Sequence, residues 1–509
     1  MQSETRSLGS SGRISHSLWL VLAALLLGGA SLAYPRTLLD SPTSTYIGSI
    51  ILEGGAPYRD AWEPRAPGIY FAYALQIFLL GKSAVALRVF DLLWQLATAF
   101  VLASIGRRLH GQSAIGLIAG VSYVVAYFSQ NFWTWAEPDT FLSLPLALAF
   151  LFLLRGLDTR KMPDWFFAAA FTGVATLFKL PYGLFGLLLL GAAIHKSRNS
   201  SRHLVSHLLG LAAGFGTPLL ACLVYFYAKG ALEDLLISQF VFAPAYLAQV
   251  HKVVGFRDFL ESMLRPVLVP PAVMGVIGLG SWIARLRGPA KPGVAEVVLA
   301  GWPAVGLASI FLHGSFLPYH YLSLFAPIAV LFASALYQVA ADFRTQRGWR
   351  HGLILLFVAL SLVVPAEKFR QRTVFAWQVI NGHVPDAPMR ELGDYIKRHT
   401  RPDDTIFIWG NAPVVYLHAE RRAASRFLCT SYLSVKVPAF DPRAIALREL
   451  ETNAPAYFAL FREGPATPAL PDALTSFEEF QALKDLLAAD YRVEREGELY
   501  TLFRRKPHR

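Results

Sequence analysis

The chain has 509 residues, of which 54% are hydrophobic and only 16% are charged. Soluble domains carry about 25% charged residues, so this composition excludes an ordinary soluble enzyme and indicates a membrane protein. The net charge of +12 sits in short loops between apolar runs, a pattern typical of membrane orientation, so we expect no nucleic-acid partner.

Eleven apolar runs are candidate membrane spans, because a span needs about 20 apolar residues with a range near 17 to 25. They cover residues 17–34, 84–105, 113–128, 140–154, 165–178, 182–194, 204–227, 267–284, 294–312, 321–340 and 352–364. The first run could also be the core of a cleaved signal peptide. We interpret it as an uncleaved span behind a polar tail, 1–16, because the later spans need it for their orientation.

The charges of the loops test this count. Every second loop is basic, and the basic residues are Arg107, Arg108, Arg155, Arg160, Lys161, Lys196, Arg198, Arg202, Arg285, Arg287, Lys291, Arg344, Arg347 and Arg350. The intervening short loops around Asn131 and Ser315 contain no Lys or Arg. By the positive-inside rule the N-terminus is cytoplasmic, and eleven spans place the C-terminal segment outside.

The last part of the chain has a different pattern. Residues 405–409, 456–460 and 500–503 are predicted strands, and 477–488 has a helical period. Alternating helices and strands indicate a small α/β layer. We therefore predict an all-α membrane domain over 17–365 and an extracytoplasmic α/β domain over 366–509.

The loop after the first span, 35–83, is the longest polar segment within the predicted membrane domain. Its acids Asp60 and Glu63 lie between two apolar stretches, 45–52 and 69–80, and Asp40 precedes the first of them. Both stretches are too short to span and are predicted to lie along the membrane surface. An enzyme acting on a lipid headgroup would place its acids there. The alternative is that Asp60 and Glu63 are ordinary solvated loop charges.

The order of residues in this loop resembles a known family. Asp40, Tyr46-Ile47-Gly48, Gly55-Ala56-Pro57-Tyr58-Arg59-Asp60, Trp62-Glu63 and Arg65-Ala66-Pro67-Gly68-Ile69-Tyr70 follow one another. The set is similar to bacterial relatives of protein O-mannosyltransferases, which belong with aminoarabinose lipid A transferases to the GT-C superfamily of membrane glycosyltransferases. Trp135-Ala136-Glu137-Pro138, Leu177-Phe178-Lys179 and Tyr319-His320-Tyr321-Leu322 extend the resemblance over about the first 340 residues. Many relatives have a second acid after the first one, whereas Ser41 follows Asp40 here.

The resemblance implies a polyprenyl-phosphate sugar as donor at the outer face of a bacterial-type inner membrane. The chain also has no phosphate-binding loop for a nucleotide sugar. Asp40 is the expected catalytic carboxylate that accepts the proton of the acceptor hydroxyl, with Glu137 as the second catalytic candidate. The candidates for stabilising the leaving phosphate are Arg59, Arg65, Lys179 and His320.

Further candidates have structural alternatives. Tyr58, Asp60, Asp139 and Tyr321 are expected to contact substrate. Asp40 and Glu137 could hold Mg²⁺ or Mn²⁺, although Glu137 and Asp139 could equally cap the helix that follows them. Lys179 could be a lysine that reaches the membrane surface, and His320 could belong to an interfacial aromatic belt.

The predicted function is transfer of a hexose or pentose from the lipid-linked donor to an acceptor reached from outside the cell. A glycolipid, a polysaccharide and a protein all fit as acceptors. The alternative is a transporter or flippase of lipid-linked sugars. A transporter would carry charges or helix breaks at mid-membrane, whereas here the polar candidates gather at one predicted face.

Overall fold

The computed structural model describes residues 4–34, 40–250, 256–287, 292–314, 316–345, 352, 356, 358–359, 362–384, 386–438, 440–462 and 473–507. These residues divide into two compact units. The first unit contains residues 1–34, 87–221 and 254–381, and the second contains 35–86, 222–253 and 382–509. The loop 35–83 therefore belongs to the same unit as the end of the chain.

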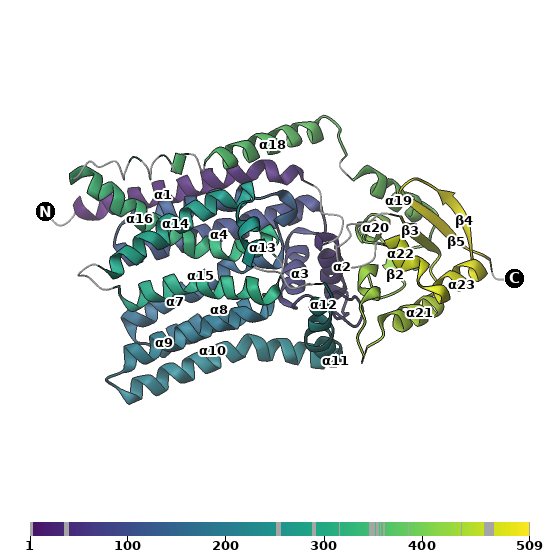
Figure 1. The fold of residues 1–509 in the computed structure, drawn as a ribbon, viewed down its shortest axis with the longest axis horizontal. Helices are drawn as coiled ribbons and strands as arrows, with labels where there is room; N and C mark the ends of the chain where they lie inside the picture. Colours follow the sequence, from purple (N-terminus) through teal and green to yellow (C-terminus); the bar gives the residue numbers. More distant parts are fainter. Residues whose placement is uncertain are drawn as a thin grey trace. The chain divides into compact units, whose positions relative to one another are not determined.

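The first unit is a bundle of helices, most of them long and apolar, that lie side by side (Figure 1). They are α1 (Glu4–Gly28), α4 (Ala84–His110, from Leu87), α5 (Ser113–Phe128), α6 (Pro138–Phe141), α7 (Ser143–Thr159), α8 (Met162–Phe178), α9 (Phe185–Ser197), α10 (Ser201–Ala228, to Ala221), α13 (Phe256–Met263), α14 (Val269–Leu286), α15 (Val294–His313), α16 (Phe325–Thr345) and α18 (Val363–Ile380). Short 3-10 turns join several of them: η1 (Gly29–Ala33), η2 (Phe132–Thr134), η3 (Leu180–Leu184), η5 (Pro266–Leu268) and η6 (Pro318–Leu324).

Close helix packing in this bundle depends on small residues. A Cβ added at Gly116 of α5 would lie 2.2 Å from the carbonyl oxygen of Ala103 in α4, and one at Gly214 of α10 would lie 2.1 Å from that of Phe166 in α8. Glycine at these positions lets two backbones approach each other, as is common between helices in membranes.

The span prediction is confirmed for most of the chain. Eight helices among the described residues are long and apolar enough to cross a membrane. Two further predicted spans, over 113–128 and 165–178, are the shorter apolar helices α5 and α8. The eleventh, 352–364, lies only partly within the described residues, so the structure does not test it. The protein is thus a multi-pass membrane protein, and its orientation stays a prediction.

The second unit combines the loop 35–83 with an α/β layer. Its helices are α2 (Asp40–Leu52), α3 (Gly68–Leu80), α11 (Leu232–Leu236), a π-helix (Ile237–Phe242), α12 (Ala243–Val250), α19 (Ala387–Arg398), α20 (Val414–Ala419), α21 (Pro442–Asn453), α22 (Ala473–Glu478) and α23 (Gln481–Asp490), with a 3-10 turn η7 (Thr430–Ser434). Its strands are β1 (Thr405–Trp409), β2 (Arg422–Ala423), β3 (Tyr457–Phe461), β4 (Tyr491–Glu496) and β5 (Tyr500–Arg505).

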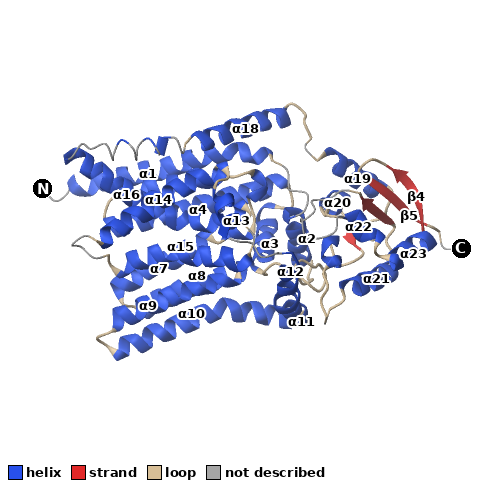
Figure 2. Cartoon of the chain, in the orientation of Figure 1, coloured by secondary structure: helices blue, strands red, loops and turns tan. Residues whose placement is uncertain are grey.

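The five strands form one mixed sheet with the order β2-β1-β3-β5-β4, drawn red in Figure 2. β1 pairs in parallel with β3, Ile406 opposite Tyr457, and β3 pairs antiparallel with β5, Ala459 opposite Leu502. β1 and β3 are almost fully buried, which explains their continuous apolar sequences. The predicted strands over 405–409, 456–460 and 500–503 are confirmed, whereas β4 alternates charged residues and carries no strong strand pattern.

The apolar stretch 45–52 forms a helix, α2, but its surroundings differ from the prediction. Residues Ser41 to Ile50 are buried inside the unit rather than spread on a surface. A Cβ at Gly48 would lie 2.9 Å from the backbone nitrogen of Ala74, so this glycine lets α2 pack closely on α3. The side chain of Tyr46 accepts a hydrogen bond from the backbone of Ala423, at 2.8 Å.

Candidate functional site

In the second unit, Asp40 begins α2 and pairs with a cation of the same loop. Its Oδ1 lies 2.5 Å from Nη2 of Arg65, and both side chains are partly exposed. Nε of Arg65 lies 3.1 Å from Oε1 of Glu63, which is 2% exposed. One guanidinium group is therefore held between two carboxylates; Asp40, Glu63 and Arg65 are called the loop site below.

The backbone around the loop site is held by aromatic side chains. The hydroxyl of Tyr58 donates to the carbonyl oxygen of Arg65 at 2.7 Å, and that of Tyr70 donates to the carbonyl oxygen of Glu63 at 2.8 Å. Tyr58 is buried and has a φ of 68°, a left-handed conformation that only a firmly packed loop imposes on a tyrosine. Tyr58, which was predicted to contact substrate, is therefore buried and stabilises the backbone of the loop at Arg65.

Glu63 is the member of this site that the sequence prediction did not select. Burial raises the pKa of Glu63 to about 7, Arg65 lowers it, and the charge of Asp40 raises it again. A loop acid is normally solvated, so its position in the sequence gave little reason to choose it. The signal that could have found it is the density of aromatic residues around it, Tyr58, Trp62 and Tyr70, which shield the carboxylate from water.

Asp60 closes a turn that follows Gly55, and its backbone nitrogen donates to the carbonyl oxygen of Ala56 at 3.1 Å. Its Oδ2 accepts a hydrogen bond from the backbone of Ala56 at 2.7 Å and lies 2.6 Å from Nη2 of Arg59. A Cβ at Gly55 would lie 2.8 Å from the same Oδ2, so a larger residue there would displace this carboxylate. Arg59 and Asp60 are thus used to hold the turn together.

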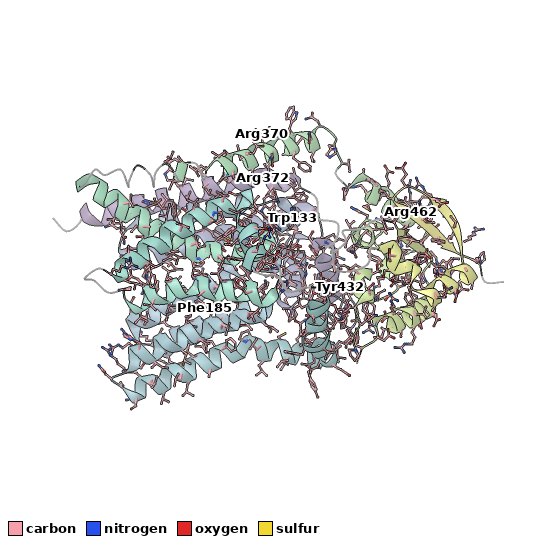
Figure 3. All side chains as sticks on the ribbon, viewed as in Figure 1. Trp133, Phe185, Arg370, Arg372, Tyr432 and Arg462 are labelled. Atoms are coloured by element: carbon pink, nitrogen blue, oxygen red, sulfur yellow. The ribbon has the colours of Figure 1, made fainter. Side chains whose placement is uncertain are left out.

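The C-terminal segment packs on the loop site within the same unit. Trp62 is fully buried and lies with its ring centroid 4.8 Å from that of Phe440 and 5.8 Å from that of Phe427. The backbone nitrogen of Trp62 donates to the carbonyl oxygen of Arg426 at 2.7 Å. Burial raises the pKa of Tyr432, labelled in Figure 3, well above its usual value, and the nearby charge of Glu63 raises it further.

In the first unit, three predicted residues come together from three separate segments. Nζ of Lys179, at the end of α8, lies 3.0 Å from Oδ1 of Asp139 in α6. Nδ1 of His320 in η6 lies 3.2 Å from Nζ of Lys179 and 3.3 Å from Oδ2 of Asp139. Asp139, Lys179 and His320, called the bundle site below, are all mostly buried, as expected for a charge that has a partner.

The remaining predicted residues lie near the bundle site in sequence. Glu137 occupies the N-cap position of α6, where its side chain makes no capping hydrogen bond, and it is 1% exposed. Ala136 before it has a φ of 62°, a second left-handed residue at a candidate site. The hydroxyl of Tyr321 lies 2.5 Å from Oγ of Ser262 and is buried.

Among the described residues, no group of three or more His, Cys, Asp or Glu side chains could hold a metal ion. Asp40 and Asp139 each pair with a cationic side chain, which disfavours binding of a second cation. Asp40 and Glu137 belong to different units, so the metal site predicted on them stays a prediction, and we derive no step through it.

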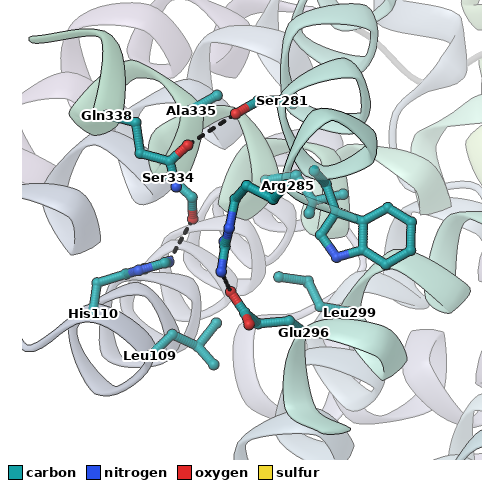
Figure 4. Close-up of a pocket in the computed structure, with 12 residues that line it drawn as sticks. Leu109, His110, Ser281, Arg285, Glu296, Leu299, Ser334, Ala335 and Gln338 are labelled. Atoms are coloured by element: carbon teal, nitrogen blue, oxygen red, sulfur yellow. Dashed lines mark hydrogen bonds and ion pairs between the residues drawn. The ribbon is translucent and has the colours of Figure 1, made fainter. Parts of the chain in front are cut away.

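A separate pocket is lined by residues of α4, α14, α15 and α16 (Figure 4). Arg285 pairs with Glu296 at 2.5 Å and His110 contacts Ser334 at 2.7 Å. Arg108, next to the pocket residue Leu109, pairs with Asp158 near the C-terminal end of α7 at 2.7 Å. Asp139 lies before the N-terminal end of α7, so the pocket and the bundle site are at opposite ends of this helix. The cavity of about 20 Å³ has room for about one water molecule, so we do not regard it as a substrate site.

Comparison with known proteins supports the resemblance seen in the sequence. Residues 64–226 match the family model described as dolichyl-phosphate-mannose-protein mannosyltransferase. Comparison with curated proteins finds no match.

Among solved structures, ArnT from Cupriavidus metallidurans bound to undecaprenyl phosphate superimposes with a TM-score of 0.60 at 13% identity, over 97% of this chain and 98% of that one. The same protein in the apo state gives a TM-score of 0.59 at 13% identity, with the same coverage. The Archaeoglobus fulgidus oligosaccharyltransferase gives 0.48 at 11% identity, over 87% of this chain and 67% of that one. The resemblance to GT-C glycosyltransferases is confirmed, and at these identities the structural likeness establishes the fold alone.

Proposed function

We propose that this protein transfers a sugar from a polyprenyl-phosphate donor to an acceptor hydroxyl at the extracytoplasmic face of a bacterial-type inner membrane. The loop site carries the proposal. It offers a carboxylate, Asp40, that is already paired with a guanidinium group in a loop bordered by the apolar helix α3. The fold shared with ArnT supports the choice of donor, because that protein was crystallised with undecaprenyl phosphate.

The chemistry requires a base and a partner for the phosphate. The acceptor oxygen forms a bond to the anomeric carbon, the bond from that carbon to the phosphate oxygen breaks, and the electron pair leaves with the phosphate. Asp40 takes the hydroxyl proton. Arg65 is the proposed partner of the leaving phosphate, because a guanidinium group binds phosphate oxygens through two parallel hydrogen bonds.

The bundle site has a proposed role in binding. Lys179 is a compact charge that could transfer from Asp139 to a donor phosphate, and His320 is placed to donate to the same group. Glu137 is the second proposed carboxylate. Arg59 is a weaker candidate, because Asp60 and the carbonyl oxygen of Lys229 already occupy its guanidinium group. The acceptor, whether glycolipid, polysaccharide or protein, is to be found by experiment.

The test is sugar transfer by the purified full chain. Radiolabelled polyprenyl-phosphate sugars would be supplied one at a time, with membrane extract as acceptor. We expect label to move with the wild type and the Asp40→Asn variant to be slower by about a hundred- to ten-thousandfold, the usual contribution of a general base. Glu53→Gln is the matched control, since Glu53 is an exposed acid at the end of α2 paired with Lys82 and Arg422.

Equal transfer by the wild type and Asp40→Asn would keep the enzyme class and remove Asp40 as the base, which moves the search to Glu137. Donor binding without transfer to any acceptor would count against the enzyme and favour a transporter of lipid-linked sugars.

A further inference from the structure

Arg372 in α18 is a buried cation whose charge no described side chain balances. Its side chain is 3% exposed, and Figure 3 labels it on the helix. Nε donates to the carbonyl oxygen of Lys368 in its own helix at 3.1 Å, but Nη1 and Nη2 make no hydrogen bond within the described structure. Burial lowers the pKa of Arg372 to about 10, so the group stays charged at neutral pH.

The surroundings of Arg372 are aromatic. Its Cζ lies 5.4 Å from the ring centroid of Trp135 and 5.9 Å from that of Phe128. Tyr34 lies edge-on to Trp135 at 5.9 Å and stacks on Phe375 at 4.3 Å. All these residues belong to the first unit.

A second buried cation reaches the same tryptophan. Arg88 is 1% exposed, and its Cζ lies 5.8 Å from the ring centroid of Trp135. A third positive charge is that of Lys368, which lies in α18 one turn before Arg372. Its Nζ donates to Oδ1 of Asn131 at 2.8 Å.

The balance of energies points to a missing anion. Contact with an aromatic ring offsets only part of the cost of removing an ion from water. Arg88 has the carboxylate of Asp91 near it, so the charge that lacks a described counterion is that of Arg372. Two unused Nη groups on a planar guanidinium match the oxygens of a phosphate, which binds such a pair through parallel hydrogen bonds.

We propose that Arg372, Arg88 and the aromatic side chains of Tyr34, Phe128 and Trp135 form a binding site for the phosphate group of a membrane lipid, separate from the loop site and the bundle site. The exposed side of α18 favours a lipid as the source of the phosphate. Among its exposed residues are Trp377, 67% exposed, and Ile380, 77% exposed, whose large apolar side chains suit contact with acyl chains. The inference does not depend on the proposed transfer reaction.

The experiment measures ligand-induced stabilisation of the purified full chain in a phosphate-free nonionic detergent. Phosphatidylglycerol, polyprenyl phosphate and inorganic phosphate are each titrated against the thermal unfolding midpoint, with diacylglycerol as the lipid that lacks phosphate. We expect at least one phosphate lipid to raise the midpoint and diacylglycerol to have no effect. If inorganic phosphate raised the midpoint as much as the phosphate lipids do, the assignment to a lipid would be contradicted.

Variants of α18 provide the specificity control. Arg372→Gln should weaken the binding of the lipid by about tenfold or more, the usual loss when a charge-assisted hydrogen bond is removed. Arg370→Gln should bind like the wild type, because Arg370 is an exposed residue of the same helix paired with Glu367 at 2.8 Å. Without lipid, Arg372→Gln should unfold at the same or a higher temperature, since it removes an unbalanced buried charge.

Two results would overturn the proposal. One is that the wild type and Arg372→Gln are stabilised equally by every phosphate lipid. The other is that no phosphate compound stabilises the wild type, in which case Arg372 only packs α18 against the bundle.

Discussion

In the loop site, the guanidinium group of Arg65 pairs with two carboxylates that differ in their burial. Asp40 is partly exposed, whereas Glu63 is buried and has a pKa of about 7. At neutral pH Glu63 is therefore close to half protonated. When Glu63 is neutral, it no longer competes with Asp40 or with a donor phosphate for the guanidinium group of Arg65.

This arrangement predicts a pH dependence of donor binding. The KM for the donor should rise as pH increases through about 7, because ionised Glu63 then competes for Arg65. The donor phosphate is a diester whose charge stays constant over this range, so the inflection reports on the protein. In the Glu63→Gln variant the inflection should disappear, and steady-state transfer rates between pH 5.5 and 8.5 measure both. An unchanged inflection would assign the titration to another group.

The same pKa shift affects stability. Burial raises the pKa of Glu63 from 4.5 to about 7, so the folded protein binds this proton more tightly than the unfolded chain. Its contribution to stability is complete below about pH 4.5 and is lost as pH rises through 7.

The bundle site predicts a coupling between two buried charges. Lys179→Met leaves Asp139 buried without its cation, which should lower stability by about 3–5 kcal/mol. Adding Asp139→Asn should restore part of the loss, with a coupling of about 0.5–3 kcal/mol between the two changes. Thermal unfolding of the wild type, both single variants and the double variant in detergent measures this coupling. Additive losses would show that the two side chains act independently in spite of their 3.0 Å separation.

At the scale of elements, the C-terminal segment holds the loop site in place. Trp62 fills a cluster made by Phe242, Phe427 and Phe440. Trp62→Ala should cost about 3–5 kcal/mol, the usual loss for removing a buried aromatic side chain. Hydrogen exchange should increase at residues 55–65, and transfer should fall with it.

Trp377→Ala is the control for this change, since Trp377 is largely exposed. Slow exchange retained at residues 55–65 in Trp62→Ala would show that the turn made by Asp60 and Arg59 fixes the loop without the C-terminal segment.

The elements also show what the sequence could predict. Long apolar runs and loop charges located the helices, because a membrane imposes length and composition directly on the chain. The contact of Asp40 with Arg65 bridges 25 residues, and that of Lys179 with His320 bridges 141. Pairings over such distances are set by tertiary packing, so no local pattern reveals them. The burial of α2 was missed for the same reason: its surroundings include α20, more than 360 residues later.

At the scale of the whole molecule, the predicted membrane topology can be tested directly. The positive-inside rule places the basic loop around Arg198 in the cytoplasm and the α/β layer with Arg401 outside. Both native cysteines, Cys222 and Cys429, are buried and free, so they give little background in a labelling experiment.

Single cysteines at two exposed positions then report on the two sides. Arg401 is 87% exposed and Arg198 is also exposed, so a cysteine at either position is open to a maleimide reagent. In intact cells a membrane-impermeant maleimide should label Arg401→Cys at once and Arg198→Cys only after permeabilisation. The reverse pattern would place the loop site in the cytoplasm, where nucleotide sugars are available. That result would remove the reason for a lipid-linked donor. Labelling of both positions before permeabilisation would mean that the number of spans between them is even.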